Sequence, residues 1–159
     1  MAIVDIETTL RDTKASSTLR ETQTYLMLGA AAGGASNASA TEQIEAQVTK
    51  QITPDATLLF QYSALGFNSH KIHLDRAYAQ QVEGLPDLVV NGGLASLLVC
   101  EILRTDCGAT PTGITTRHTA PLFVDRPMTI AANPSDTGWS VWLYDDANVL
   151  AASMEITCS

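Results

Sequence analysis

The sequence predicts an α+β fold in which a curved antiparallel sheet wraps around one long buried helix. The first observation is residues 94–103, which are apolar nearly all round. A helix of that kind is buried inside a domain rather than lying on its surface. The second is a series of alternating segments after residue 110, which indicates three or four antiparallel strands. A sandwich of two sheets would have no place for such a helix.

The N-terminal part is expected to contribute a strand and a connector. Residues 2–10 are rich in Ile, Val and Thr and partly alternate, which favours a strand. Residues 29–40 contain only Ala, Gly, Ser and Asn, a composition that cannot anchor a packed face and indicates a flexible connector. We therefore divide the chain into an N-terminal strand and linker, residues 1–42, and a single domain, residues 43–159.

The expected domain begins with one strand and two short helices. Residues 44–48 show the period-two alternation of a half-buried strand. A helix is expected to follow Thr53, which can cap it, with Pro54 at the first helical position. A second short helix is expected to begin at Asp75 and end near Gly84.

The strands after the long helix are predicted from their alternation and from the turns between them. They cover residues 112–124, 127–132, 138–145 and 149–158. The sequence DDAN, residues 145–148, is expected to join the last two as a hairpin. One helix enclosed by such a sheet is the hot-dog arrangement. Because a lone sheet of this kind leaves an exposed edge strand, we expect a homodimer or larger homo-oligomer.

Composition and charge argue against several classes of function. The net charge is −8, with 17 acidic against 9 basic residues and no Lys/Arg run, which argues against nucleic acid as a partner. The apolar stretches fall short of the ~20 residues of a membrane span, and the N-terminus lacks a signal-peptide layout, so we expect a cytoplasmic protein without membrane contact. The 3 cysteines show no C-x-x-C spacing, which argues against a disulfide framework or a zinc knuckle.

The densest polar chemistry lies in residues 67–75, with the sequence FNSHKIHLD. Two of the 3 histidines, His70 and His73, fall there beside Asn68 and Asp75. Histidines next to a turn can simply cap it. Metal binding would use the same atoms, but no third ligand is evident elsewhere, so we predict neither a metal nor another cofactor.

Residues 60–94 resemble the hydratase motif of the MaoC-like hot-dog enzymes. The nearest branch is the 3-methylfumaryl-CoA (mesaconyl-CoA) hydratases and the related hydroxyacyl-thioester dehydratases. The likeness extends over residues 50–157, and the segment before it resembles the strand and linker that join two hot-dog units in longer relatives. The family motif Asp-x-Asn-Pro-x-His-x-Asp falls on Asn68, His70, Lys71, His73 and Asp75. Asn68 therefore stands at the catalytic Asp, and an amide cannot accept a proton.

The resemblance implies an enoyl-thioester hydratase, reversible as a 3-hydroxyacyl-thioester dehydratase. Its substrate would be an acyl-CoA, including a dicarboxylic acyl-CoA of the mesaconyl type. This reaction needs a base for water, an acid for the α-carbon and a donor for the enolate-like oxygen. His73 is the expected proton carrier. Asn68 would hold the water, and His70 would orient it or share the proton.

The sequence NGG, residues 91–93, opens the long helix, where unpaired backbone N–H groups bind anions. Gly92 and Gly93 are therefore expected to form an oxyanion hole, although plain helix-start geometry explains them too. Asn91 and Arg117 are the candidate substrate-binding residues. The relatives usually have His-Gly-Pro in place of residues 91–93 and a second Arg in place of Ala120.

Two other functions remain open on the sequence. Asn68, Asn91 and Ala120 each weaken a family feature, so a catalytically weak or inactive acyl-CoA-binding subunit is the first alternative. A thioesterase is the second, because hot-dog folds also host thioester hydrolysis.

Overall fold

A computed structural model describes residues 2–13, 18–27 and 44–159. The chain divides into two units, Met1–Gly34 and Ala35–Ser159, and each is described by itself. The predicted connector and the predicted boundary between residues 42 and 43 lie outside the described residues.

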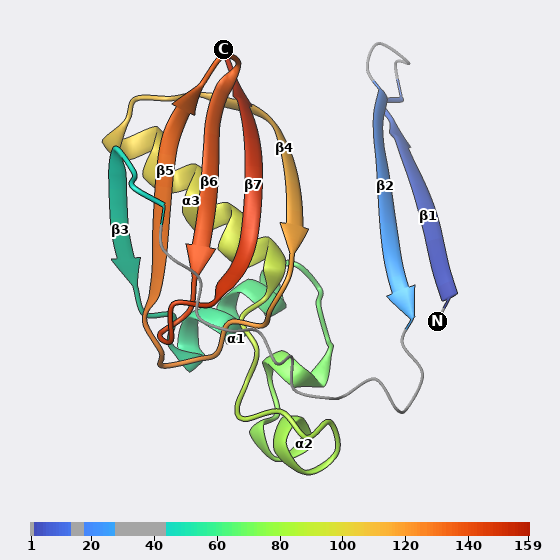
Figure 1. The fold of residues 1–159 in the computed structure, drawn as a ribbon. Coiled ribbons are helices and arrows are strands. Elements are labelled where there is room, and N and C mark those ends of the chain that lie inside the picture. Colours follow the sequence, from blue (N-terminus) through green and yellow to red (C-terminus); the bar gives the residue numbers. More distant parts are fainter. Residues whose placement is uncertain (1, 14–17, 28–43) are drawn as a thin grey trace. The chain divides into compact units, whose positions relative to one another are not determined.

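The first unit contains a two-stranded antiparallel sheet of β1 (Ala2–Arg11) and β2 (Thr18–Met27) (Figure 1). The strand predicted for residues 2–10 is confirmed. Between the two strands, the Thr24 hydroxyl donates to Asp5 Oδ1 over 2.7 Å. Isolated two-stranded hairpins are marginally stable in water, so side-chain contacts of this kind matter to it.

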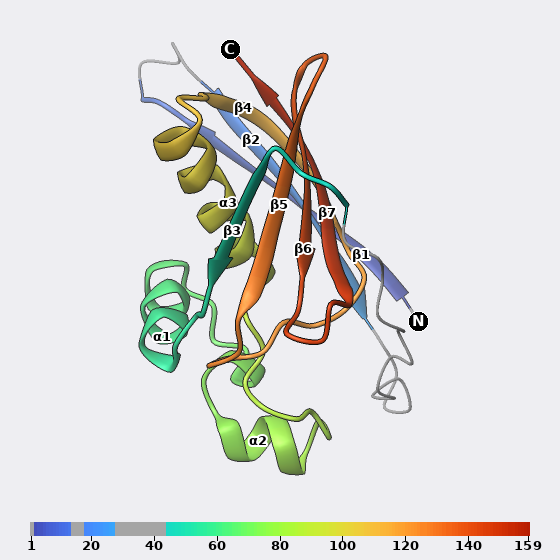
Figure 2. The same ribbon diagram turned by 60° about the vertical axis from the view of Figure 1, so that its left-hand side comes forward.

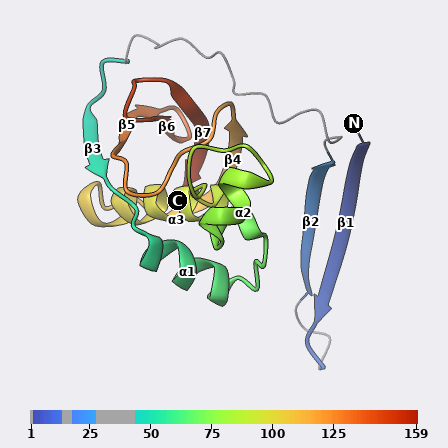
Figure 3. The same ribbon diagram turned by 90° about the horizontal axis from the view of Figure 1, so that it is seen from below.

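The second unit is a five-stranded antiparallel sheet with the strand order β3-β5-β6-β7-β4. Its strands are β3 (Val48–Ile52), β4 (Pro111–His118), β5 (Met128–Ser135), β6 (Gly138–Tyr144) and β7 (Leu150–Cys158). The 15-residue helix α3 (Gly92–Asp106) lies against one face of this sheet, and the end-on view shows the sheet curving over it (Figure 3). The predicted helix and the four predicted strands after it are confirmed, with boundaries shifted by a few residues.

The core lies between α3 and the concave face of the sheet. The helix contributes Leu94, Ala95, Val99, Ile102 and Leu103. The sheet contributes, among others, Met128, Ile130, Val141, Leu143, Met154 and Ile156. The prediction that this helix is buried on all sides was wrong, because Leu97 is 56% exposed. The reason is that, among the described elements, the sheet covers only one side of the helix (Figure 2).

The first strand of this unit begins later than predicted. Residues 44–48 were expected to be extended and paired, but the ladder starts at Val48. Asn133 on the neighbouring strand explains the difference. Its Oδ1 accepts from the Gln47 N–H over 2.7 Å, and its Nδ2 donates to the Glu45 carbonyl over 2.9 Å. A side chain thus takes the backbone partners that a longer strand would have used.

The first helix of the unit, α1 (Ala56–Leu65), starts two residues later than the sequence suggested. Its N-cap is Asp55, whose Oδ1 accepts from the Leu58 N–H over 2.7 Å. The cap predicted at Thr53 was wrong, and Pro54 precedes the cap instead of opening the helix. An Asp at this position also outranks Thr in capping preference.

The motif at residues 67–75 folds as a short 3-10 turn, η1 (Lys71–His73), between two helices. The helix after it, α2 (Arg76–Gln81), is capped by Asp75, which accepts from the Tyr78 N–H over 3.0 Å. The predicted helix start at Asp75 is confirmed. This cap fixes the direction in which the chain leaves η1 and so helps to hold His73 in place.

The predicted hairpin turn between the last two strands is confirmed. Asp145 Oδ1 accepts from the backbone N–H groups of Ala147 and Val149, over 2.9 and 2.8 Å. Asn148 takes the left-handed conformation, with φ 60°, which Asn tolerates better than most residues. None of the described helices is long and apolar enough to cross a membrane.

Candidate active site

His73 is a buried imidazole, 9% exposed, at the end of η1. Its Nδ1 lies 2.7 Å from the carbonyl oxygen of Val89. A carbonyl only accepts, so Nδ1 carries the proton and the neutral ring keeps Nε2 as an acceptor. Burial lowers the pKa of His73 below its ordinary value of 6.5, and the nearby His70 lowers it further, against the opposing effect of the Val89 hydrogen bond. His73 is therefore a free base at neutral pH.

A cleft of about 390 Å³ opens beside this imidazole. Residues from four elements or their ends line it, including His73, Val89, Gly92, Ala95, His118 and Ala120. The volume falls within the range of small-ligand sites, about 300 to 1,000 Å³. Among the described residues that line it there is no Asp, Glu, Lys or Arg. The cleft is thus an apolar space with two imidazoles in its wall.

Gly92 begins α3 and forms part of this wall. The first backbone N–H groups of a helix have no partner within the helix, and the positive end of its dipole lies there. A methyl group added at Gly92 would lie 2.8 Å from His118 Nε2 and 2.9 Å from His118 Cε1. A side chain at this position would push the imidazole away, so the glycine allows His118 of β4 to lie against the start of α3.

The other two residues of the NGG sequence are used for packing. A methyl group at Gly93 would collide with the hydroxyl of Tyr62, and Gly93 does not line the cleft. Asn91 is buried, 1% exposed, and its Nδ2 donates to Ser63 Oγ over 3.3 Å. Its Oδ1 has no hydrogen-bond partner in the described part of the chain. Asn91 thus ties the start of α3 to α1, and it does not line the cleft.

The remaining predicted residues also lie outside the cleft lining. Asn68 Oδ1 accepts from the His70 N–H over 3.1 Å, so the amide stabilises the turn before η1. His70 is exposed, and its ring meets that of His73 edge to face, with centroids 5.7 Å apart. Arg117 is exposed on β4, and since neighbours on a strand face opposite sides, it points away from the side of His118.

Of the predicted residues, only His73 and Gly92 line the cleft, and the structure adds a third residue, His118. The sequence noted His118 only as a histidine in a strand pattern. Its position at the very end of a strand was the one available signal, because strand ends are where side chains reach the rim of a sheet. No three His, Cys, Asp or Glu side chains gather into a potential metal site within the described ranges.

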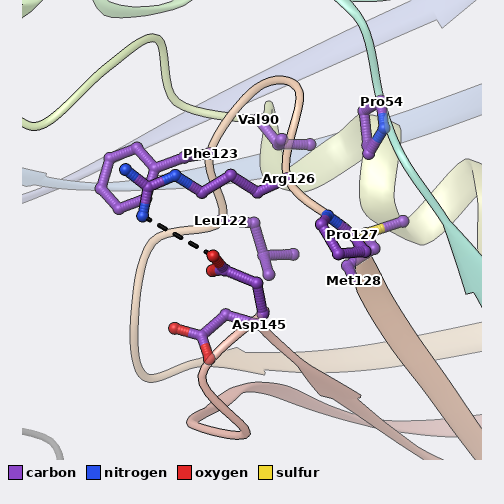
Figure 4. A pocket seen from close by; sticks show the side chains of 9 residues that line it. Pro54, Val90, Leu122, Phe123, Arg126, Pro127, Met128 and Asp145 are labelled. Atoms are coloured by element: carbon purple, nitrogen blue, oxygen red, sulfur yellow. Dashed lines mark ion pairs between the residues drawn. The ribbon is translucent and has the colours of Figure 1, made fainter.

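A second, smaller depression lies where the segment after β4 meets the β6–β7 turn (Figure 4). The guanidinium of Arg126 lies 5.2 Å from the centre of the Phe123 ring and 3.9 Å from Asp146 Oδ2. The remaining wall is mainly apolar, with Pro54 and Met128. The depression is too narrow to admit a water molecule and contains no histidine, so we regard it as a packed corner of the fold.

Solved structures share this fold. HtdX from Mycobacterium tuberculosis matches with a TM-score of 0.69 at 16% identity, over 98% of this chain and 61% of that protein. The (R)-hydratase from A. caviae involved in PHA biosynthesis matches with a TM-score of 0.61 at 18% identity, over 75% of this chain and 98% of that protein. At these identities the likeness shows the fold alone, and it confirms the predicted hot-dog arrangement.

Curated relatives show a closer likeness in sequence. Mesaconyl-C(4)-CoA hydratase from Chloroflexus aurantiacus is 40% identical over 111 residues, which are 69% of this chain and 40% of that protein. The mitochondrial hydroxyacyl-thioester dehydratase type 2 of Schizosaccharomyces pombe is 32% identical over 90 residues, 55% of this chain and 30% of that protein. The match thus spans less than half the length of each of these relatives. The family model described as hydroxyacyl-thioester dehydratase type 2 matches residues 2–124. The chain therefore belongs to the hydroxyacyl-thioester dehydratase type 2 family, as the motif around His73 predicted.

Proposed function

We propose that this chain carries an enoyl-thioester hydratase site that also dehydrates 3-hydroxyacyl thioesters, with acyl-CoA as the substrate. One observation carries the proposal. The imidazole of His73, held by the Val89 carbonyl with Nε2 left as a base, lines the same cleft as Gly92 at the start of α3. Membership of the family supports the same reaction.

In the hydration direction, His73 Nε2 takes a proton from water as the water oxygen bonds to the β-carbon of the enoyl group. The electron pair of the double bond moves toward the thioester, which becomes enolate-like. The resulting imidazolium then returns a proton to the α-carbon and becomes neutral again. Water is consumed, and no charge remains. The hydrogen bond from Nδ1 to Val89 keeps the ring oriented through both transfers.

The enolate-like oxygen needs hydrogen-bond donors that are already in place. We assign this role to the backbone N–H of Gly92, which lines the cleft. Gly93 packs against Tyr62 outside the lining, and as part of the first turn of α3 it contributes to the positive end of the helix dipole. Asn68 and His70 serve the reaction through the turn that carries His73. The apolar remainder of the cleft suits an acyl chain and keeps bulk water from the reacting carbons.

A dicarboxylic acyl-CoA of the mesaconyl type is our more specific proposal for the substrate, supported by the 40% identity to mesaconyl-C(4)-CoA hydratase. No cationic side chain is among the described residues lining the cleft. We therefore assign Arg117 to the CoA phosphates outside it, and we limit Asn91 to shaping the start of α3 beside the substrate.

The test is a spectrophotometric screen in which crotonyl-CoA and mesaconyl-CoA lose their conjugated absorbance on hydration. Wild-type protein should turn over at least one of them, and His73→Ala should not. A thiol reagent in the same cuvette separates hydration from thioester hydrolysis, because only a thioesterase releases free CoA. Loss of absorbance that is unchanged in His73→Ala would refute the proposed site.

The absence of a carboxylate among the described lining residues favours a second candidate, a non-catalytic acyl-CoA-binding subunit. Such a subunit would bind the thioesters in calorimetry without turning them over.

β3 and β4 are the outer strands of the sheet, and we propose that edge pairing forms a homodimer or larger homo-oligomer. Light scattering on the purified chain tests that state.

A further inference from the structure

His118 is the only titratable side chain besides His73 among the described residues that line the cleft. The two imidazoles come from different elements, His73 from η1 and His118 from the last residue of β4. The reaction described above uses one of them as base and acid. It leaves the second without a role, although His118 faces the same space.

The position of His118 relative to α3 is defined by Gly92. The ring atoms Nε2 and Cε1 lie 2.8 and 2.9 Å from where a Gly92 Cβ would be, so the imidazole lies against the first residue of the helix. Unpaired N–H groups and the positive end of the helix dipole converge at this point. A thioester oxygen at this location would gain from these hydrogen-bond donors.

Burial lowers the pKa of His118 below its ordinary value of 6.5, so the ring is neutral at neutral pH. A neutral imidazole has one N–H donor and one acceptor. It lacks the charge expected of a group that binds a substrate carboxylate. It is also a poor proton donor to carbon, because giving up its only N–H proton would leave an anionic ring. What it offers is an uncharged hydrogen-bond donor on an exposed residue whose ring lies against Gly92.

We propose that His118 donates an N–H hydrogen bond to the thioester oxygen as negative charge develops there, beside the backbone N–H groups at the start of α3. The proton stays on His118 throughout, and the electron pair that reaches the oxygen comes from the carbon–carbon double bond. This inference rests on the proposed hydratase function and adds a catalytic residue to it. A neutral imidazole that polarises a carbonyl next to a helix N-terminus is an established catalytic solution elsewhere.

The test compares His118→Ala, which removes the donor, with His118→Gln, which keeps an uncharged N–H donor. His118→Ala should lower kcat on the enoyl-CoA that wild type hydrates by about 10²- to 10³-fold, the usual effect of losing one oxyanion donor. KM should change by less than about threefold, because the hydrogen bond strengthens in the transition state. His118→Gln should recover kcat to within about tenfold of wild type. Thr115→Ala, exposed on the same strand, is the matched control.

A second readout does not depend on turnover. Butyryl-CoA carries the same thioester but has no double bond to hydrate, and a ¹³C label on its carbonyl gives that group a separate infrared band. Hydrogen bonding should lower the frequency of this band in wild type and His118→Gln, and His118→Ala should return it toward the solution value. A residue that only fills space at Gly92 would change the melting temperature and leave the band where it is.

The outcomes separate the inference from the function it rests on. Wild-type hydration with an unchanged kcat in His118→Ala overturns the role of His118 and leaves the hydratase standing. No turnover by wild type on any thioester overturns the hydratase. The carbonyl band of bound butyryl-CoA then tests by itself whether His118 donates a hydrogen bond to the thioester. A band shift that depends on His118 supports the hydrogen bond, whereas an equal shift in all variants, or no binding of butyryl-CoA, overturns it.

Discussion

Replacing His73 with Asn isolates its chemistry from its packing. The Asn amide can place a donor near the position of Nδ1 and keep the 2.7 Å hydrogen bond to the Val89 carbonyl, but it cannot take up a proton. His73→Ala removes both functions. The pair of variants therefore separates loss of the base from loss of the hydrogen bond.

The expected size of each effect follows from the geometry. Loss of the general base should lower kcat by ~10² to 10⁴ in both variants. That range corresponds to about 2.7 to 5.4 kcal/mol in the activation free energy. His73→Ala should in addition lose about 1 to 3 kcal/mol of unfolding free energy, because a partly buried carbonyl is left without its donor. His73→Asn should lose about 1 kcal/mol or less.

The assay is the decrease of enoyl-CoA absorbance, followed across pH, with urea unfolding of each variant as the control for folding. Burial lowers the pKa of His73, so the wild-type rate should rise with pH, with the midpoint of the rise below pH 6.5, and then reach a plateau. Both variants should lack this rise. A His73→Asn variant that is folded and retains kcat within about threefold of wild type would refute the assignment of His73 as base.

Three further outcomes are expected. Gly138→Ala should cost about 2 to 4 kcal/mol of unfolding free energy, because its Cβ would collide with the Ile156 carbonyl in a sheet that cannot open there. Gly84 has φ 68°, but a Cβ there would meet nothing within 4 Å, so Gly84→Ala should cost only about 1 kcal/mol of unfolding free energy. Equal losses of unfolding free energy in the two glycine variants, measured by urea unfolding, would contradict the steric argument. Asn68→Ala should lose about 1 kcal/mol with the turn hydrogen bond, while Asn68→Asp keeps the acceptor and should melt close to wild type. Because the pKa of His73 is lower in the folded protein, the unfolded chain binds a proton more readily as the pH falls. The contribution of neutral His73 to stability is therefore complete above pH 6.5 and is lost as the pH falls through the folded-state pKa. The unfolding free energy should therefore fall less steeply below pH 6.5 in His73→Asn than in wild type. Identical slopes of unfolding free energy against pH in the two proteins would contradict this role of His73.

Features set by neighbouring residues could be predicted from the sequence. The alternation in residues 149–158 and the DDAN turn predicted the last hairpin, and Asp75 predicted the start of α2. These patterns are local, because a strand repeats every two residues and a cap acts within one turn. The family motif around His73 is local in the same way.

One local prediction failed, because Asp55 and not Thr53 caps α1. The other failed predictions depended on distant partners. Residues 44–47 alternate like a strand, yet the Asn133 side chain takes their hydrogen bonds. Leu97 belongs to an apolar helix, yet it is exposed because no described strand covers that side of α3. In both places the local residue pattern was read correctly, but contacts with another part of the chain determined the hydrogen bonding or the burial of those residues.

The sequence by itself determined the class of fold, the family and the imidazole most suited to carry a proton. Only the tertiary structure decided which side chains share a cleft with it. It excluded Arg117 and included His118, one residue further along the same strand, because adjacent side chains on a strand face opposite ways and only one of them meets the start of α3. That choice depends on the pairing of β4 with β7 and on its packing against α3, contacts between segments far apart in the chain.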